Sequence, residues 1–197
     1  MQKDLLNSAS DKKHIIFDFD KTLFWLDLEW DYFFDDIEMH MKELDANLFD
    51  SYMRNDISWG DMQNMYVHQF GSSISNKISN NSSIVEKRLL KRIVPNDELL
   101  NFIRQLDGDI TLSVWSSNSR SIIEDTLIEY GLIHRFKTIA SRTDVTMLKP
   151  FVDGFNLIYD GQSDRSSYLM VGDSDADCRA AAAAGIDFHA VTMSIFR

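Results

Sequence analysis

Five short, nearly continuous apolar runs recur along the chain, each with the length of a β-strand. Strands covered on both faces lack the polar–apolar alternation of half-exposed ones, and these runs mostly lack it. Between most of the runs, apolar positions repeat every three or four residues, the period of a helix face. Strands that alternate with helices predict an α/β fold with a doubly wound, Rossmann-like parallel sheet. The predicted strands cover residues 15–19, 109–115, 138–141, 168–171 and 188–191.

Residues that favour helix ends bound three of the predicted helices. Asn96 can cap a helix that ends near Gly108, and Ser119 or Ser121 can begin one that stops at Gly131. The third helix spans residues 177–184 and is closed by Gly185. Residues 1–11 are polar and predict a loose tail.

Residues 24–93 break the alternation, because only helix patterns occur there. One helix face would carry Leu26, Trp30, Phe33, Ile37, Met41, Leu44 and Leu48, and a second Trp59, Met62, Tyr66 and Phe70. Residues 71–83 are rich in Ser and Asn and predict a loop, and residues 84–93 predict a last helix that stops before Pro95. We therefore expect a helical cap domain over 24–93, inserted into a core domain formed by 1–23 and 94–197.

Three of the four tryptophans lie in this insertion: Trp25, Trp30 and Trp59. Aromatic residues at helical spacing usually pack in a core, so the first interpretation is that they form the core of the insertion. The alternative is that one or two of them face a ligand site.

Unusual polar residues follow the predicted strands at their carboxyl ends, where ligands bind in open parallel sheets. Asp18 and Asp20 stand two apart at the end of the first strand, which would place both side chains on one face. Asp173 ends the fourth strand. Carboxylates this close repel one another unless a cation lies between them or one of them is protonated, and Mg²⁺ is the common cation for such oxygen ligands. Lys149 would add a further positive charge, so the sequence predicts a site for a doubly charged phosphate.

Four motifs in the same order resemble the haloacid dehalogenase superfamily. The resemblance covers about residues 13–192, and the four motifs together are far more specific than any one of them. The motifs are an apolar strand followed by Asp18-x-Asp20-x-Thr22, a strand ending in Ser116-Ser117-Asn118, Lys149-Pro150 with Phe155 six residues after the lysine, and Gly172-Asp173-x-x-x-Asp177.

The resemblance implies catalytic roles for several of these residues. Asp18 would be the nucleophile that forms an aspartyl-phosphate. Asp20 would protonate the leaving oxygen and then activate the hydrolytic water. Ser116 would hydrogen-bond the phosphoryl group, with Ser117 as the alternative, and Lys149 would hold both that group and Asp18.

The resemblance also implies a magnesium site. Mg²⁺ would be held by Asp18, by Asp20 through its backbone carbonyl, and by Asp173. Asp177 would orient Lys149 or a metal-bound water; the alternative is that it only caps the helix that it opens. Thr22 is expected to be structural, its hydroxyl bonding the backbone of the turn after the strand.

Asp20 favours phosphate chemistry, because an alkoxide leaving group needs a proton and Asp20 is placed to supply it. Superfamily members that cleave carbon–halogen bonds lack an acid at this position. The helical insertion resembles a type 1 cap, which suits a small phosphorylated substrate. We therefore predict a magnesium-dependent phosphatase acting on small phosphomonoesters. One alternative is a phosphomutase of the β-phosphoglucomutase type, and another is a non-catalytic binding or regulatory module with the same fold.

Composition and charge narrow the partners further. The net charge of −11 argues against nucleic-acid and anionic-membrane partners, both of which favour basic patches. Residues 1–13 have no apolar stretch of signal-peptide length, and no membrane span is predicted. Cys178 is the only cysteine, which favours a reducing compartment, so we expect a cytoplasmic protein. The sequence makes no prediction of oligomeric state.

Overall fold

The computed structural model describes residues 2–28, 30–106 and 108–196; side chains are described except those of residues 2–3, 30–40, 77, 80–82 and 196. Within these residues, one sheet has five parallel strands in the order β5-β4-β1-β6-β7. The strands are β1 (His14–Phe17), β4 (Thr111–Trp115), β5 (Phe136–Ala140), β6 (Tyr168–Gly172) and β7 (Asp187–Ala190). The predicted parallel α/β fold is confirmed.

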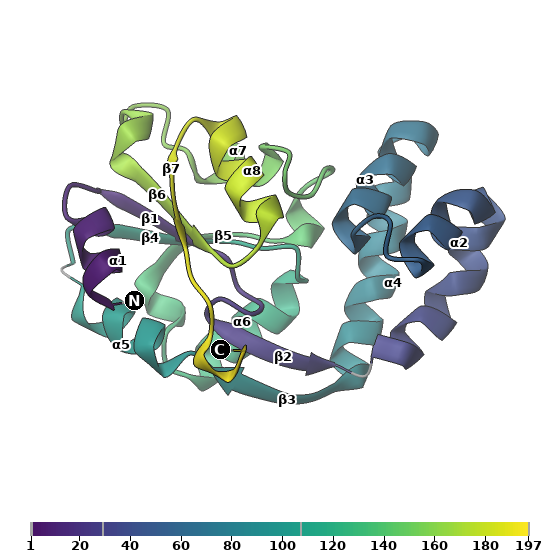
Figure 1. The fold of residues 1–197 in the computed structure, drawn as a ribbon, viewed down its shortest axis with the longest axis horizontal. Helices are drawn as coiled ribbons and strands as arrows, with labels where there is room; N and C mark the ends of the chain where they lie inside the picture. The colour runs from purple at the N-terminus through teal and green to yellow at the C-terminus, as the bar shows by residue number, and fades with distance from the viewer. Residues whose placement is uncertain (1, 29, 107, 197) are drawn as a thin grey trace.

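Helices cover both faces of this sheet (Figure 1). One face is covered by α7 (Asp153–Ile158) and α8 (Asp175–Ala184), and the other by α1 (Gln2–Ala9), α5 (Asp97–Gln105) and α6 (Arg120–Glu129). Side chains alternate between the two faces of β1, so this strand contributes to both apolar cores. Ile16 packs in one core, and Ile15 and Phe17 pack in the other. Covering on both faces explains why the strands read as unbroken apolar runs.

A second unit of three helices lies beside the carboxyl edge of the sheet (Figure 1). It consists of α2 (Trp30–Met53), α3 (Trp59–Phe70) and α4 (Ser73–Leu89). Both connections to the core run through an antiparallel ribbon of β2 (Phe24–Leu28) and β3 (Leu90–Pro95). The α3 helix begins at the predicted place because the Ser58 hydroxyl accepts the Asp61 backbone N–H at its amino end.

The ribbon corrects the expectation that residues 24–93 contain helices only. Phe24, Leu26 and Leu28 are buried, whereas Trp25 and Asp27 between them are half-buried, which is the period of a strand. The spacing of Leu26 to Trp30 also fits a helix face, which is why the sequence pattern predicts a helix there. Pairing of Leu26 with Ile93 decides the conformation, and that partner is distant in the sequence.

Two further expectations about local structure are wrong. Residues 73–89 form α4, not a loop followed by a helix over 84–93, because Ile78, Val85 and Leu89 are buried and tertiary packing overrides the weak helix propensity of Ser and Asn. Residues 2–9 form α1 rather than a loose tail, because Leu5 and Ala9 are buried against the core.

Candidate active site

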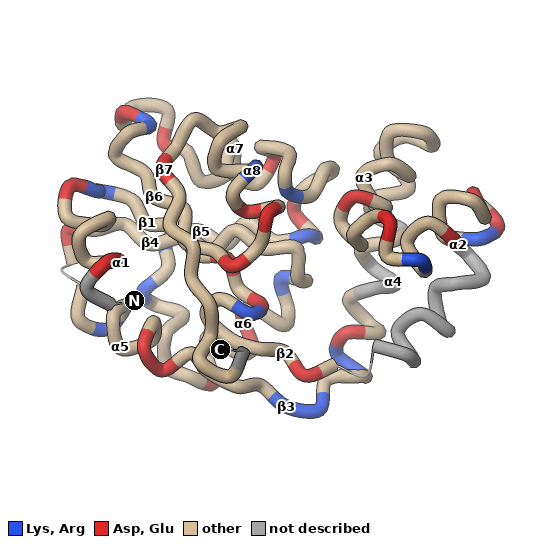
Figure 2. The backbone as a smooth tube through the Cα atoms, in the orientation of Figure 1, with Lys and Arg blue, Asp and Glu red and all other residues tan. Residues whose placement is uncertain are grey.

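The ends of the parallel strands meet at one pocket of about 320 Å³, which is large enough for a small ligand. Asp18 follows β1, Ser116 follows β4 and Asp173 follows β6. Charged positions of both signs gather in the loops between the sheet and helices α3 and α4 (Figure 2). The pocket is lined by Asp18, Asp20, Lys21, Ser58, Trp59, Gly60, Glu86, Ser116, Ser117, Asn118, Arg142, Lys149, Asp173, Ser174 and Ala176.

Lys149 lies between two carboxylates at the floor of this site. Its Nζ donates to Asp18 Oδ1 at 2.6 Å and also to Asp177 Oδ1. All three residues are buried. Burial by itself lowers the pKa of Lys149, but Asp177 and Asp18 more than offset this, and the pKa is raised. Lys149 therefore stays charged and fixes one oxygen of Asp18.

Asp177 serves as both the lysine partner and the helix cap that were expected as alternatives. Its Oδ2 accepts the Ser174 N–H at 3.0 Å and the Ser174 hydroxyl at 2.6 Å, which forms a capping box at the start of α8. Its Oδ1 faces Lys149. The capping box at the start of α8 therefore fixes the Asp177 carboxylate, and this carboxylate in turn orients Lys149.

The acidic cluster fits a hard divalent cation. Among the described residues, Asp18, Asp173 and Asp177 bring carboxylate oxygens within 4.8 Å of one another. Burial raises the pKa of Asp18 to about 7, with Lys149 opposing the shift and Asp177 adding to it. Lys149 contacts two of these three carboxylates and carries a single positive charge. Carboxylate oxygens are the ligands that Mg²⁺ prefers, so the cluster fits this cation. Because Asp177 is already engaged by Lys149 and Ser174, Asp18 and Asp173 are the more available carboxylate ligands.

Asp20 lies in the same pocket but is not one of the three clustered carboxylates. The strand β1 ends at Phe17, so Asp18 and Asp20 both lie beyond it. The Asp20 carboxylate accepts the Leu26 backbone N–H of β2 at 2.9 Å. Burial raises the pKa of Asp20 to about 6, although the Leu26 hydrogen bond opposes the shift. Asp20 therefore lies in the pocket as a carboxyl group that can carry a proton near neutral pH.

The three predicted hydroxyl residues differ in their contacts. The Thr22 hydroxyl donates to Asp173 Oδ1 at 3.3 Å, not to the backbone of its turn as expected. Ser116 and Ser117 both line the pocket. Ser116 is buried directly after β4, and its Oγ donates to Asn118 Oδ1 at 2.9 Å. Ser117 is half-buried, and its backbone carbonyl accepts from Arg142.

Several residues that line the pocket are not among the predicted site residues. Arg142 lies just after β5, so the same strand-end rule that selected Asp18 would have found it. Glu86 comes from α4 and had no local signal. Trp59 does line the pocket, which agrees with the alternative interpretation of the tryptophans.

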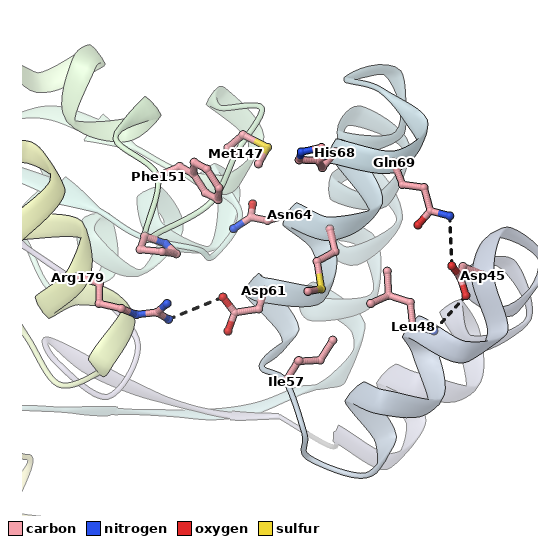
Figure 3. Close-up of a pocket in the computed structure, with 12 residues that line it drawn as sticks. Asp45, Leu48, Ile57, Asp61, Asn64, His68, Gln69, Met147, Phe151 and Arg179 are labelled. Carbon is pink, nitrogen blue, oxygen red and sulfur yellow. Dashed lines mark hydrogen bonds and ion pairs between the residues drawn. The ribbon is translucent and has the colours of Figure 1, made fainter.

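A second cleft of about 710 Å³ lies beside this pocket, between the helical unit and the core (Figure 3). Polar contacts of Asn64 and Asp61 join the helical unit to the core across this cleft. The Asn64 amide accepts the Leu148 N–H at 2.7 Å and donates to the Leu148 carbonyl at 3.1 Å. Asp61 faces Arg179 across the cleft at 3.7 Å (Figure 3). The helical unit is therefore hydrogen-bonded to Leu148, the residue next to Lys149.

The α/β core, the acidic strand ends and the lysine between two carboxylates agree with the four motifs that resemble the haloacid dehalogenase superfamily. The sequence profile of the haloacid dehalogenase-like hydrolases matches residues 15–191, and the chain belongs to this family. No curated protein sequence matches the chain significantly.

Solved structures with the same fold share little sequence with the chain. A protein described as a haloacid dehalogenase-like hydrolase from Bacteroides fragilis has a TM-score of 0.65 at 22% identity, covering 92% of this chain and 88% of that one. A protein described as a predicted phosphoglycolate phosphatase from Haemophilus somnus has a TM-score of 0.59 at 17% identity, covering 93% and 86%. A magnesium-bound hydrolase of the superfamily from Bacillus subtilis has a TM-score of 0.53 at 17% identity, covering 90% and 85%.

Across the described residues, every helix is too short or too polar to cross a membrane.

Proposed function

We propose that the chain is a magnesium-dependent phosphatase that hydrolyses small phosphomonoesters through an aspartyl-phosphate on Asp18. The observation that carries the proposal is the buried contact between Lys149 Nζ and Asp18 Oδ1 at 2.6 Å, in a pocket that also contains Asp20 and Ser116. It holds a carboxylate in a fixed orientation at the end of a strand, as a nucleophile requires.

In the first half of the reaction, a carboxylate oxygen of Asp18 attacks phosphorus and the bond to the leaving oxygen breaks. Asp20, whose raised pKa lets it hold a proton, protonates that oxygen. Ser116 and Lys149 hold the oxygens of the phosphoryl group. Mg²⁺, held by Asp18, the Asp20 backbone carbonyl and Asp173, would neutralise negative charge on that group.

In the second half, Asp20 takes a proton from water, and the water oxygen attacks the phosphorus of the aspartyl-phosphate. The acyl-phosphate bond breaks, which releases phosphate and restores Asp18. The helical unit over 24–93 would act as a cap that limits access by bulk water and bulky substrates. A pocket of about 320 Å³ favours a small ester over a folded phosphoprotein.

The decisive substitution is Asp18→Asn, assayed with p-nitrophenyl phosphate in the presence of Mg²⁺. We expect at least a 10³-fold loss of kcat, because the amide cannot form the covalent intermediate. Unchanged turnover in a folded variant would contradict the mechanism.

A panel of sugar phosphates, phosphoglycolate, nucleoside monophosphates and phosphoserine then identifies the substrate. Phosphoglycolate belongs in the panel because structural neighbours carry that activity in their names. Measuring free phosphate against isomer formation distinguishes a phosphatase from a phosphomutase.

A further inference from the structure

Glu86 is an acid of the helical unit that is buried among loops of the core. It lies on α4 and is 1% exposed. One carboxylate oxygen accepts from Asn118 Nδ2 at 3.4 Å, and the other accepts the Ser119 backbone N–H at 3.2 Å. The second oxygen also lies 2.7 Å from Arg142 Nη2. The loop after β4 is therefore fixed by a side chain that the core itself does not supply.

This contact determines the orientation of the Asn118 amide. A carboxylate only accepts hydrogen bonds, so it must face the amide nitrogen of Asn118. The amide oxygen is then directed to Ser116, whose hydroxyl donates to it at 2.9 Å. The Asn118 backbone N–H donates to Ser116 Oγ at 3.2 Å. Both contacts place the Ser116 oxygen at one point beside the pocket.

We propose that Glu86 is a positioning residue for phosphoryl binding, acting through Asn118 on the Ser116 hydroxyl. The inference rests on the proposed function, in which Ser116 holds an oxygen of the phosphoryl group. The two contacts with Asn118 hold the Ser116 oxygen in place before the substrate arrives, so that only the hydroxyl proton must turn from Asn118 to a phosphoryl oxygen. Loosening this oxygen adds reorganisation to the reaction and lowers the rate. The helical unit would thereby complete the site chemically as well as cover it.

The competing explanation is that Glu86 serves only as the counter-charge of Arg142. Arg142 is 2% exposed, and its Nη1 donates to the Ser117 carbonyl at 3.0 Å. Loss of one partner of a buried ion pair destabilises the fold because the other charge is left uncompensated. Glu86→Gln must therefore be compared with the double variant E86Q/R142Q, in which charge balance is restored.

The experiment measures kcat and KM for p-nitrophenyl phosphate, and the dissociation constant of inorganic phosphate by calorimetry, all with Mg²⁺. We expect Glu86→Gln to lower kcat and weaken phosphate binding by roughly tenfold, as loss of a supporting hydrogen bond does at comparable sites. The double variant should stay equally impaired. In a Ser116→Ala background, Glu86→Gln should cost less than a further twofold, because the two residues act through one hydroxyl.

Asp61→Asn is the matched control. Asp61 also bridges the helical unit and the core through Arg179, but at 3.7 Å and with 33% of its side chain exposed. Its loss should leave both measurements within twofold of wild type.

Wild-type kinetics in the double variant would show that Glu86 only balances Arg142 and would overturn the inference. So would a full tenfold loss that persists in the Ser116→Ala background. A wild-type chain without turnover would instead contradict the proposed function. The binding of inorganic phosphate would then still decide the role of Glu86. Weaker binding in both Glu86→Gln and E86Q/R142Q would support the inference. Unchanged binding in these variants, or no binding to the wild-type chain, would overturn it.

Discussion

Burial changes the pKa of several side chains in this protein. Asp18 and Asp20 both have a raised pKa because the folded chain removes them from water. Burial lowers the pKa of Lys149, but the two carboxylates that face it more than offset this effect. The same physical effect acts far from the pocket on His14, at the opposite end of β1. Its ring stacks on Tyr168 with centroids 4.1 Å apart.

His14 should make the protein less stable in mild acid. Burial lowers the pKa of His14 below its usual 6.5, although Asp160 opposes the shift. Below pH 6.5 the unfolded chain therefore binds a proton that the folded chain resists, and stability falls as the pH drops towards the folded pKa. Urea unfolding of wild type and His14→Gln between pH 7.5 and 5 should show a smaller loss of stability in the variant. The exposed His134→Gln serves as the control; equal pH slopes in wild type and His14→Gln would contradict the prediction.

At the scale of elements, the site depends on how strand β6 meets helix α8. The chain turns sharply from Gly172 through Asp173 into the capping box of Ser174 and Asp177. A Cβ added to Gly172 would lie 2.7 Å from the Cβ, Cγ and Oδ2 atoms of Asp177. The helix start and the lysine partner can therefore occupy these places only if residue 172 has no side chain.

Gly172→Ala should displace Asp177 and disturb Lys149 with it. We expect the free energy of unfolding to fall by about 1–3 kcal/mol through overpacking, and phosphatase activity to fall as well. Urea denaturation and the aryl phosphate assay measure the two effects. Gly108→Ala is the control, since its Cβ would meet nothing within 4 Å and its φ lies outside the glycine-favouring region. A Gly172→Ala protein as active and stable as this control would contradict the role assigned to Asp177.

For the whole molecule, the predicted magnesium site links ligand binding to stability. Asp18 and Asp173 approach each other only in the folded chain, because they come from the ends of strands far apart in the sequence. A cation bound between them favours the folded state over the unfolded one.

Mg²⁺ should therefore raise the melting temperature. At about 100 times Kd, binding stabilises by roughly 2.7 kcal/mol, which corresponds to roughly 5–10 °C for a chain of this size. Thermal melts with Mg²⁺ or with EDTA measure the shift, and Asp173→Asn should abolish it while changing the metal-free melt little, because Asp173 is exposed. An equal shift in that variant would place the metal elsewhere.

Local patterns along the chain are sufficient to predict the parallel core and the residues of the strand-end motifs. Apolar runs such as β1 and β6 have the length and the flanking residues of buried strands. Because ligands bind at the carboxyl ends of parallel strands, the sequence also predicts that Asp18, Ser116 and Asp173 line one site, and all three line the pocket. Lys149 and Asp177 followed from their motifs, and the structure places them in direct contact. These features depend on local pattern and on one general property of parallel sheets.

Other conformations follow from packing against partners that are distant in the sequence. Phe24–Leu28 is a strand because it pairs with Leu90–Pro95, and Ser73–Leu89 is a helix because its apolar side is buried by other elements. Glu86 entered the site for the same reason, since its position relative to Asn118 is set by how α4 packs on the core. Such placements are determined by long-range packing free energy, for which a local window of sequence contains no signal.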